Sequence, residues 1–350
     1  MITQSIRHTY HRYRTLQTHV ISALPVAILM PHSACNCRCV MCDIWKDNKN
    51  LRQLTTDDVR ELTESFRKLG TKQVVMSGGE ALLNPNFFEL CRVIKTQRIH
   101  ITLLSTGLSL KRNMDLLLQW VDDIIVSLDG DEATHDAIRN VDGAFHKVSE
   151  AVRAIKSIRP SYPITSRTVI HRLNFRVWNR IIECAKEMGI DRVSFLPADV
   201  RSGAFNREQR WDEHRQADVA LSVEELPKLK AVLDDLFNRY HADFESGFIA
   251  ETPAKLSKIY SYYAALHGLN PFPYKKCNAP WVSTVIEPDG SVRPCFFHEP
   301  IGNFRGKDLS QVLNSSAAIQ FRKHLKMEEN ETCRSCVCYL NLPPQLNPVK

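Results

Sequence analysis

Four cysteines lie close together in the segment PHSACNCRCVMCDIWK: Cys35, Cys37, Cys39 and Cys42. Thiols crowded onto one loop can form disulfides, hold a structural zinc ion or hold an iron–sulfur cluster. The C-x3-C-x2-C spacing of Cys35, Cys39 and Cys42 lets a short loop reach three corners of a [4Fe–4S] cube and leaves one iron open. Structural zinc sites favour two separated C-x2-C pairs. The pattern therefore favours a cluster, with Cys37 as a non-ligand.

The composition is that of a folded protein without disulfide staples. The chain has 350 residues, of which 11 are cysteines and 43% are hydrophobic. A chain of this length can bury a hydrophobic core without disulfides. We expect reduced thiols and a cytoplasmic location. Cys91 and Cys184 fall on the apolar faces of predicted helices and are expected in the core.

Neither a membrane nor a nucleic acid is expected as a partner. The run VISALPVAILM follows basic residues but is interrupted by Pro25, lacks a small-residue cleavage site and is too short to span a bilayer. It is interpreted as a buried strand that leads into the cysteine loop. The net charge of +7 is scattered rather than gathered into a dense basic run.

Short aliphatic segments alternate with amphipathic helical segments from about residue 24 to 200. The predicted strands are 25–30, 72–77, 100–105, 123–129, 163–170 and 192–197. The segment 55–70 has a Thr/Asp start and a glycine stop, as helices do. Such alternation predicts parallel β/α units in an open or partial barrel, and no GxGxxG motif supports two Rossmann-like halves. The cysteine loop follows the first strand, at the barrel end where active sites lie.

The alternation stops after about residue 205. A long helix is predicted over 221–244, and the Pro- and aromatic-rich segment GLNPFPYKK leads into a second cysteine region. We expect a domain boundary between about 245 and 275. The expected domains are an N-terminal extension (1–23), a barrel (24–245) and a small C-terminal domain (246–350).

The cysteine loop, SGGE (77–80) after the second strand and SLDG (127–130) after the fourth together resemble the radical S-adenosylmethionine (SAM) superfamily. The resemblance covers about residues 20 to 200 and implies an α/β fold with a partial (β/α)6 TIM-like barrel. It implies a [4Fe–4S] cluster on Cys35, Cys39 and Cys42, whose open iron binds SAM. Reductive cleavage of SAM would give a 5′-deoxyadenosyl radical that takes a hydrogen atom from a substrate.

The resemblance also assigns cofactor contacts. Gly78 and Gly79 would let the backbone approach the methionine end of SAM, and Glu80 would accept a hydrogen bond from its ammonium group. Arg139 would pair with its carboxylate. Polar groups at strand ends would reach the ribose: Ser105, Thr106, Ser127 and Asp129. Met41 stands where relatives often have an aromatic residue near adenine, so no contact is assigned there.

The second cysteine region resembles the auxiliary-cluster domains called SPASM, with two clusters, or twitch, with one. EPDG predicts a hairpin turn between STVI and SVRPC, and CRSCVC follows. Too few cysteines remain for two full clusters, so the resemblance implies one auxiliary [4Fe–4S] cluster. The implied ligands are Cys277, Cys295, Cys333 and Cys336. Cys338 is an alternative to Cys336, and a four-cysteine zinc ribbon is an alternative to the cluster.

The implied function is a radical SAM oxidoreductase or maturase acting on a small metabolite or a peptide. About 34 residues precede Cys35, too few for a peptide-recognition domain. The auxiliary cluster would handle electrons or substrate, and a flavodoxin or ferredoxin would supply low-potential electrons. Two alternatives stay open: a cysteine-rich metal protein that binds nucleic acid or senses redox state, and a radical RNA-modifying enzyme. No catalytic residue is assigned, and His171, His298 and Asp199 are given no role.

Overall fold

The computed structural model describes residues 2–205 and 210–344. Within these residues the strands form one sheet in the order β6-β5-β4-β3-β2-β1-β7-β8-β9. The first six strands in the chain are β1 (Val26–Leu29), β2 (Gln73–Met76), β3 (His100–Ser105), β4 (Asp123–Ser127), β5 (Ile164–Ile170) and β6 (Arg192–Pro197). Every neighbouring pair among them is parallel. The predicted α/β fold with six parallel β/α units is confirmed.

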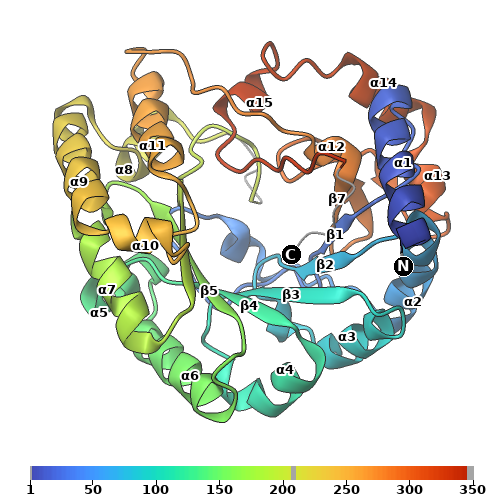
Figure 1. Ribbon diagram of the computed structural model, residues 1–350, viewed down its shortest axis with the longest axis horizontal. Helices are drawn as coiled ribbons and strands as arrows, with labels where there is room; N and C mark the ends of the chain where they lie inside the picture. The colour runs from blue at the N-terminus through green and yellow to red at the C-terminus, as the bar shows by residue number, and fades with distance from the viewer. Residues whose placement is uncertain (1, 206–209, 345–350) are drawn as a thin grey trace.

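Helices link these strands and surround the curved sheet (Figure 1). They are α2 (Thr56–Leu69), α3 (Phe87–Lys95), α4 (Met114–Trp120), α5 (Glu132–Arg139), α6 (Ala144–Ile158) and α7 (Trp178–Met188). The predicted helix signals operate in α2, where Thr55 and Asp58 form a reciprocal capping box and Gly70 ends the helix in the left-handed region. Its apolar face buries Val59 and Phe66 against the sheet.

The strands alternate between a face packed under helices and a face turned to the barrel interior. Along β5, residues 164, 166, 168 and 170 are buried, whereas residues 165, 167 and 169 are half-exposed. β1, β2 and β4 show the same alternation. Several of the half-exposed positions line an interior cavity, among them Ile28, Val75, Ile125 and Arg167, so side chains from successive strands enclose it.

The C-terminal region continues the barrel sheet. The predicted hairpin is present as β7 (Ser283–Ile286) and β8 (Ser291–Arg293), followed by β9 (Gly302–Asn303). Its first strand also pairs in parallel with β1, with Val26 opposite Ser283. The sequence did not predict this pairing, because no local pattern records which distant strand a short apolar segment will join.

Further helices lie at the two ends of the chain. They are α1 (Ile2–Thr18), α12 (Ala279–Val282), α13 (Leu309–Leu313), α14 (Ser316–His324) and α15 (Glu331–Ser335). α1 packs against α12, and Arg322 of α14 donates to the carbonyl of His19, just after α1, at 2.8 Å. Trp281 donates a hydrogen bond to His19, just after α1, with a nitrogen–nitrogen distance of 3.1 Å. The N-terminal segment is therefore joined to the C-terminal cysteine region.

The predicted long helical segment over 221–244 is present, but it is divided into shorter helices rather than being one continuous helix. That segment holds a 3₁₀ turn (Val223–Glu225), α9 (Leu226–Arg239) and α10 (His241–Glu245), after α8 (Glu213–Val219). Ser222 and Glu225 close a capping box, Pro227 starts the next helix, and Tyr240 leaves helical geometry at φ −106° and ψ 26°. Apolar residues continue at helical spacing across these breaks, so the sequence pattern does not reveal them.

Helix α11 (Pro253–Leu266) occupies the segment where a domain boundary was expected. Thr252 caps it and Pro253 stands in its first turn. It packs against β6 and α9, and the Tyr263 hydroxyl donates to the carbonyl of Ile170 at 2.6 Å. This helix thus covers the last barrel strand. Along the described residues, no helix is both long and apolar enough to cross a membrane.

Candidate active site

The first cysteine loop runs from β1 to a 3₁₀ turn (Ile44–Asp47) and is held by its own flanking residues. The backbone N–H of Cys35 donates to Asn48 Oδ1 at 3.0 Å, and Asn48 Nδ2 donates back to the Cys35 carbonyl at 2.9 Å. The indole of Trp45 donates to the Cys42 carbonyl at 2.9 Å. The loop is fixed at both ends of the three-cysteine motif.

The SGGE motif ends β2 directly beneath this loop. Glu80 is fully buried, and its carboxylate accepts hydrogen bonds from the hydroxyls of Ser105 and Thr106 and from the backbone N–H of Thr106 and Leu82, at 2.7–3.2 Å. Its own N–H donates to the Ala34 carbonyl at 2.9 Å. Burial raises the pKa of Glu80, although these hydrogen bonds oppose the rise. Glu80 therefore joins the ends of β2 and β3 to the cysteine loop.

The two glycines of the motif have a packing role that the sequence did not indicate. A Cβ on Gly79 would stand 2.2 Å from the Ala34 carbonyl oxygen and 3.1 Å from Cys35 Cβ. Gly78 has φ +113°, which favours glycine, and a Cβ there would lie 3.2 Å from the His32 carbonyl oxygen. Both residues let the end of β2 pass close under the cysteine loop. Their approach to SAM stays a prediction.

A buried ion pair connects the SLDG motif to the same loop. Arg139, at the end of α5, pairs with the carboxylate of Asp129 and points Nη1 at Cys39 Sγ, 3.5 Å away. Asp129 also accepts from the N–H of Val169 at 3.1 Å. Burial raises the pKa of Asp129 even though Arg139 opposes the rise. Arg139 and Asp129 are thus partners of each other, and their cofactor contacts stay predictions.

Of the predicted ribose contacts, the structure brings Ser105 and Thr106 onto Glu80, and Thr106 also donates to Asn36 of the cysteine loop at 2.9 Å. Among the described residues, Ser127 makes no hydrogen bond to Glu80, although it directly follows Val126, the register partner of Ser105. It ends β4, is half-buried on the barrel's interior face and is the register partner of Arg167 on β5. These positions are compatible with one ligand spanning the strand ends.

The surroundings of Cys39 in the first loop favour its thiolate form. The Cys37 thiol hydrogen-bonds Cys39 and lowers the pKa of Cys39 to about 6; burial opposes this and the Arg139 guanidinium adds to it. Hydrogen bonds to Cys35 and Cys39 raise the pKa of Cys37. Cys37 is accordingly a thiol donor inside the loop, consistent with the prediction that it is not a ligand.

The donor set fits an iron–sulfur cluster. Across the described ranges, no three His, Cys, Asp or Glu side chains converge closely enough to hold a single metal ion. A [4Fe–4S] cube does not need that convergence, because each thiolate binds a different iron. Three cysteines on a loop fixed at both ends, beside a guanidinium, supply such separated ligands.

Two residues at the start of α8, Trp211 just before it and Arg215 within it, contact the loop, and the sequence did not predict this contact. Trp211 donates its indole N–H to Asp43 Oδ2 at 2.7 Å, next to Cys42. Arg215 stacks with its Cζ 4.6 Å from the Trp211 ring centroid and donates to the carbonyl of Val40. No local pattern relates residues 211–215 to the cysteine motif, so only the tertiary fold shows this contact.

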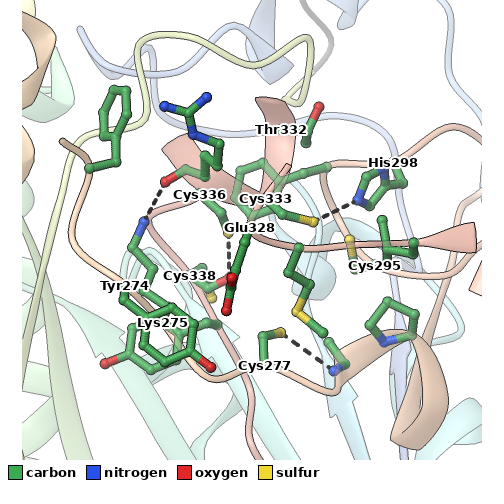
Figure 2. Close-up of a pocket in the computed structure, with 18 of the residues that line it drawn as sticks. Tyr274, Lys275, Cys277, Cys295, His298, Glu328, Thr332, Cys333, Cys336 and Cys338 are labelled. Carbon is green, nitrogen blue, oxygen red and sulfur yellow. Dashed lines mark hydrogen bonds between the residues drawn. The ribbon is translucent and has the colours of Figure 1, made fainter. Parts of the chain in front are cut away.

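The second cysteine region surrounds a separate cavity of about 360 Å³ (Figure 2). All five of its cysteines line this cavity: Cys277, Cys295, Cys333, Cys336 and Cys338. His298 Nε2 lies 3.3 Å from Cys333 Sγ, and the Cys336 thiol donates to the Cys338 carbonyl at 2.8 Å. The short spacing between Cys295 and His298 was the one sequence feature that could have indicated that this histidine lies near the auxiliary cysteines. One cavity ringed by thiols fits one cluster, and the choice between Cys336 and Cys338 stays open.

The two sites meet at the barrel interior. A cavity of about 390 Å³ extends from Ser77 at the end of β2 to Cys295, Cys336 and Cys338. It is lined by the interior residues of β1, β2, β4 and β5 and by α11. The auxiliary cysteines therefore close the barrel opposite the strands that carry the predicted cofactor contacts.

Family comparison agrees with this architecture. Residues 29–185 match the radical SAM superfamily, and residues 277–337 match an iron–sulfur cluster-binding domain, SPASM. The chain therefore carries a radical SAM domain and a SPASM domain. It is an enzyme whose barrel takes a [4Fe–4S] cluster and SAM, with auxiliary iron–sulfur binding in the C-terminal domain. These domains set aside the alternative of a metal protein without catalytic activity.

Individual relatives differ in what they act on. The chain is 27% identical to AdoMet-dependent heme synthase of Methanosarcina barkeri over 45% of this chain and 46% of that protein. It is 25% identical to PqqA peptide cyclase of Streptomyces rochei over 81% of this chain and 73% of that one. Streptococcus suis SuiB, solved with the precursor peptide SuiA, shares the fold with a TM-score of 0.64 at 15% identity, covering 93% of this chain and 72% of that one.

Proposed function

We propose that this protein modifies an unactivated C–H position of a peptide or a small metabolite bound in the barrel interior. When bound, the cluster and SAM supply an organic radical that removes a hydrogen atom from the substrate. The names of the relatives support both substrate classes, since one is a peptide cyclase and another a haem synthase.

One observation supports the proposal most strongly. The interior cavity is bounded by the end of β2 on one side and by Cys295, Cys336 and Cys338 on the other. A substrate in this cavity would lie between the two cysteine regions. The auxiliary region is then suitably located to bind the substrate or to receive an electron from it.

The residues have distinct proposed tasks. Cys35, Cys39 and Cys42 hold the barrel cluster, and Glu80 accepts a hydrogen bond from the ammonium group of SAM. Arg139 balances the negative charge of the thiolate loop, since its guanidinium already lies against Cys39. The buried surroundings of Glu80 and Arg139 exclude water from the reacting groups. A low-potential flavodoxin or ferredoxin supplies the electron.

The test is an anaerobic reaction of reconstituted protein with SAM, dithionite and deuterated candidate peptides or metabolites. The proposal expects formation of 5′-deoxyadenosine that carries deuterium when the right substrate is present. A protein that holds its clusters but forms no 5′-deoxyadenosine under any condition contradicts it. Label that stays in a substrate which is nevertheless converted also contradicts it.

A further inference from the structure

An arginine projects into the interior cavity from the middle of the barrel wall. Arg167 lies on β5, with Ser127 of β4 and Ser194 of β6 as its register partners on either side. Its side chain is half-buried on the interior face and lines the cavity of about 390 Å³. Because Ser127 ends the SLDG strand, Arg167 is adjacent to the predicted cofactor contacts.

Within the described residues, Arg167 differs from the other cations of this cavity because its guanidinium makes no hydrogen bond and no ion pair. Lys255 pairs with Glu251 at 3.5 Å, Lys258 donates to the Tyr274 carbonyl at 2.9 Å, and Lys275 donates to the Arg334 carbonyl at 3.0 Å. No carboxylate in the described part of the chain pairs with Arg167, and its Nε is buried without a hydrogen-bond partner.

The cavity carries an excess of positive charge. Among the described residues that line it, four are cationic (Arg167, Lys255, Lys258 and Lys275) and one is a carboxylate, Glu251. Glu251 is already committed, since it accepts from Ser194 Oγ at 2.8 Å and from the Phe195 N–H at 3.1 Å. Much of the remaining lining is apolar, and withdrawing even part of a guanidinium from water into such surroundings has a cost that an anionic partner offsets.

We propose that Arg167 anchors a carboxylate group of the substrate in the barrel interior. The guanidinium fork matches a carboxylate with two parallel hydrogen bonds, which a lysine cannot reproduce. A peptide offers such a group as an aspartate, a glutamate or its C-terminus, and a porphyrin offers it as a propionate. This assignment rests on the proposed function, because it takes the same cavity as the substrate site.

Arg167 also lies near the auxiliary cysteines, so an effect on their charge must be distinguished from carboxylate binding. Arg167 is close enough to Cys338 to oppose the rise that burial causes in the pKa of that thiol. If Arg167 served only to balance charge on the auxiliary thiolates, its loss would alter the auxiliary cluster without changing the selection of acidic ligands.

The experiment measures binding of matched acidic and neutral probes to the reconstituted full chain under anaerobic conditions. One pair is protoporphyrin IX and its dimethyl ester, followed by absorbance. The other is a synthetic octapeptide with one glutamate and the same peptide with glutamine, amidated at the C-terminus, followed by calorimetry. The pair that shows the preference identifies the source of the carboxylate.

Wild-type protein should prefer the acidic member of one pair by roughly tenfold to a hundredfold, the range of a charged hydrogen bond. Arg167→Gln should abolish this preference, and Arg167→Lys should restore part of it. Arg153→Gln is the matched control, because Arg153 is an exposed arginine on α6 and its loss changes net charge equally. That variant should keep the full preference.

Three results overturn the inference: no acidic preference in either pair, a preference unchanged in Arg167→Gln, or a change confined to the redox potential of the auxiliary cluster. Dithionite-driven 5′-deoxyadenosine formation without substrate is measured in the same samples. It should persist in Arg167→Gln, so loss of the carboxylate anchor remains distinguishable from failure of the proposed radical chemistry.

Discussion

The two cysteine regions differ in how the protein prepares its thiols. The barrel loop is tied to its surroundings by Asn48, Trp45 and Arg139, and the pKa of Cys39 is lowered to about 6 by the Cys37 hydrogen bond. In the C-terminal region, burial raises the pKa of Cys295 to about 11 and that of Cys333 to about 12. Cys39 of the barrel loop therefore lies in surroundings that favour thiolate, whereas burial disfavours thiolate at Cys295 and Cys333.

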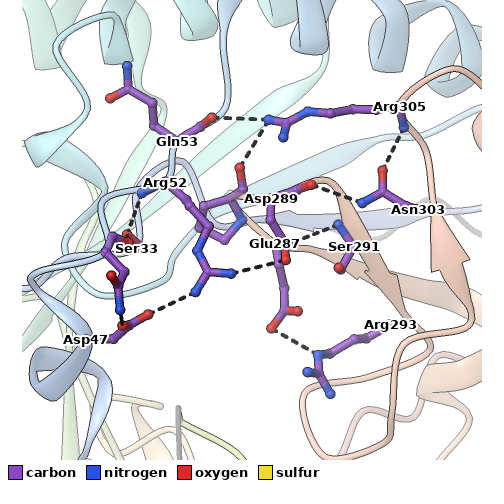
Figure 3. Close-up of polar contacts among 12 residues, drawn as sticks. Ser33, Asp47, Arg52, Gln53, Glu287, Asp289, Ser291, Arg293, Asn303 and Arg305 are labelled. Atoms are coloured by element: carbon purple, nitrogen blue, oxygen red, sulfur yellow. Dashed lines mark hydrogen bonds and ion pairs between the residues drawn. The ribbon is translucent and has the colours of Figure 1, made fainter.

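The two regions are nevertheless mechanically joined. Figure 3 shows Arg52, just after the cysteine loop, between Asp47 at 2.9 Å and Asp289 of the β7–β8 turn at 3.4 Å. Arg305 donates to the Gln53 carbonyl at 3.2 Å and pairs with Asp58 at 2.9 Å. Polar contacts thus hold the C-terminal hairpin against the segment that follows the barrel loop.

The largest expected effect is the loss of a whole cluster. Reconstituted wild-type protein should hold about eight irons, and a variant with Cys333→Ala and Cys336→Ala should hold about four. Iron and zinc are measured together by elemental analysis after gel filtration. About four irons with one zinc in the wild type would show that the C-terminal region is a zinc site, which contradicts an auxiliary cluster there.

The buried pair behind the barrel loop should matter most for stability. Arg139→Met leaves the Asp129 carboxylate buried without a partner, so it should cost about 3–5 kcal/mol in unfolding free energy. Arg60→Met, which removes an exposed pair with Asp57, should cost less than about 1 kcal/mol. Denaturant unfolding of the metal-free protein measures both. Equally small losses of unfolding free energy in the two variants would mean that the Arg139–Asp129 pair does not stabilise the protein around the barrel loop.

Replacement of Glu80 tests the cofactor side of the barrel site. Glu80→Gln keeps the shape but removes the charge, so SAM should bind more weakly by about 1.5–3 kcal/mol while both clusters are retained. Calorimetry under anaerobic conditions measures the affinity, and Glu89→Gln is the control, because Glu89 is half-exposed on α3 and pairs with Arg92, away from the cysteine loop. Unchanged SAM affinity in Glu80→Gln would limit Glu80 to the structural contacts with Ser105, Thr106 and the cysteine loop.

The smallest effect concerns a contact between the two regions. Asp308 caps α13 and pairs with Lys68 of α2 at 2.9 Å, and this pairing lowers the pKa of Asp308 to about 2. A lowered pKa contributes stability above the ordinary aspartate value of 3.8, and this contribution is lost as pH falls toward 2.

Asp308→Asn should therefore lower the melting temperature of metal-free protein at pH 7, with a loss of at most about 1 kcal/mol. The difference from wild type should shrink as the pH is lowered from 5 toward 3. A difference that stays constant over this range would assign the effect to the cap alone rather than to the charge.

The sequence predicted those features that short-range patterns encode. The strands, the capped helix α2, the hairpin and the three cysteine-bearing or glycine-rich loops follow from local periods and motifs, and all were predicted within a few residues. Other features arise only when distant segments meet in the fold. They are the pairing of β7 with β1, the contact of Trp211 and Arg215 with the cysteine loop, and the position of Arg167 Nε without a hydrogen-bond partner. The breaks around α9 were missed because an apolar period can continue through a proline start and a single non-helical residue.

The division of work between the two cysteine regions is tested most directly by counting 5′-deoxyadenosine. Two variants are compared with wild type under strong reductant: one without Cys35, Cys39 and Cys42, and one without Cys333 and Cys336. Each must first be shown to be folded, since loss of a cluster also removes folding energy. The first variant should form no 5′-deoxyadenosine, whereas the second should keep slow formation without completing turnover. Formation that survives loss of the barrel cysteines would contradict the assignment of SAM cleavage to the first loop.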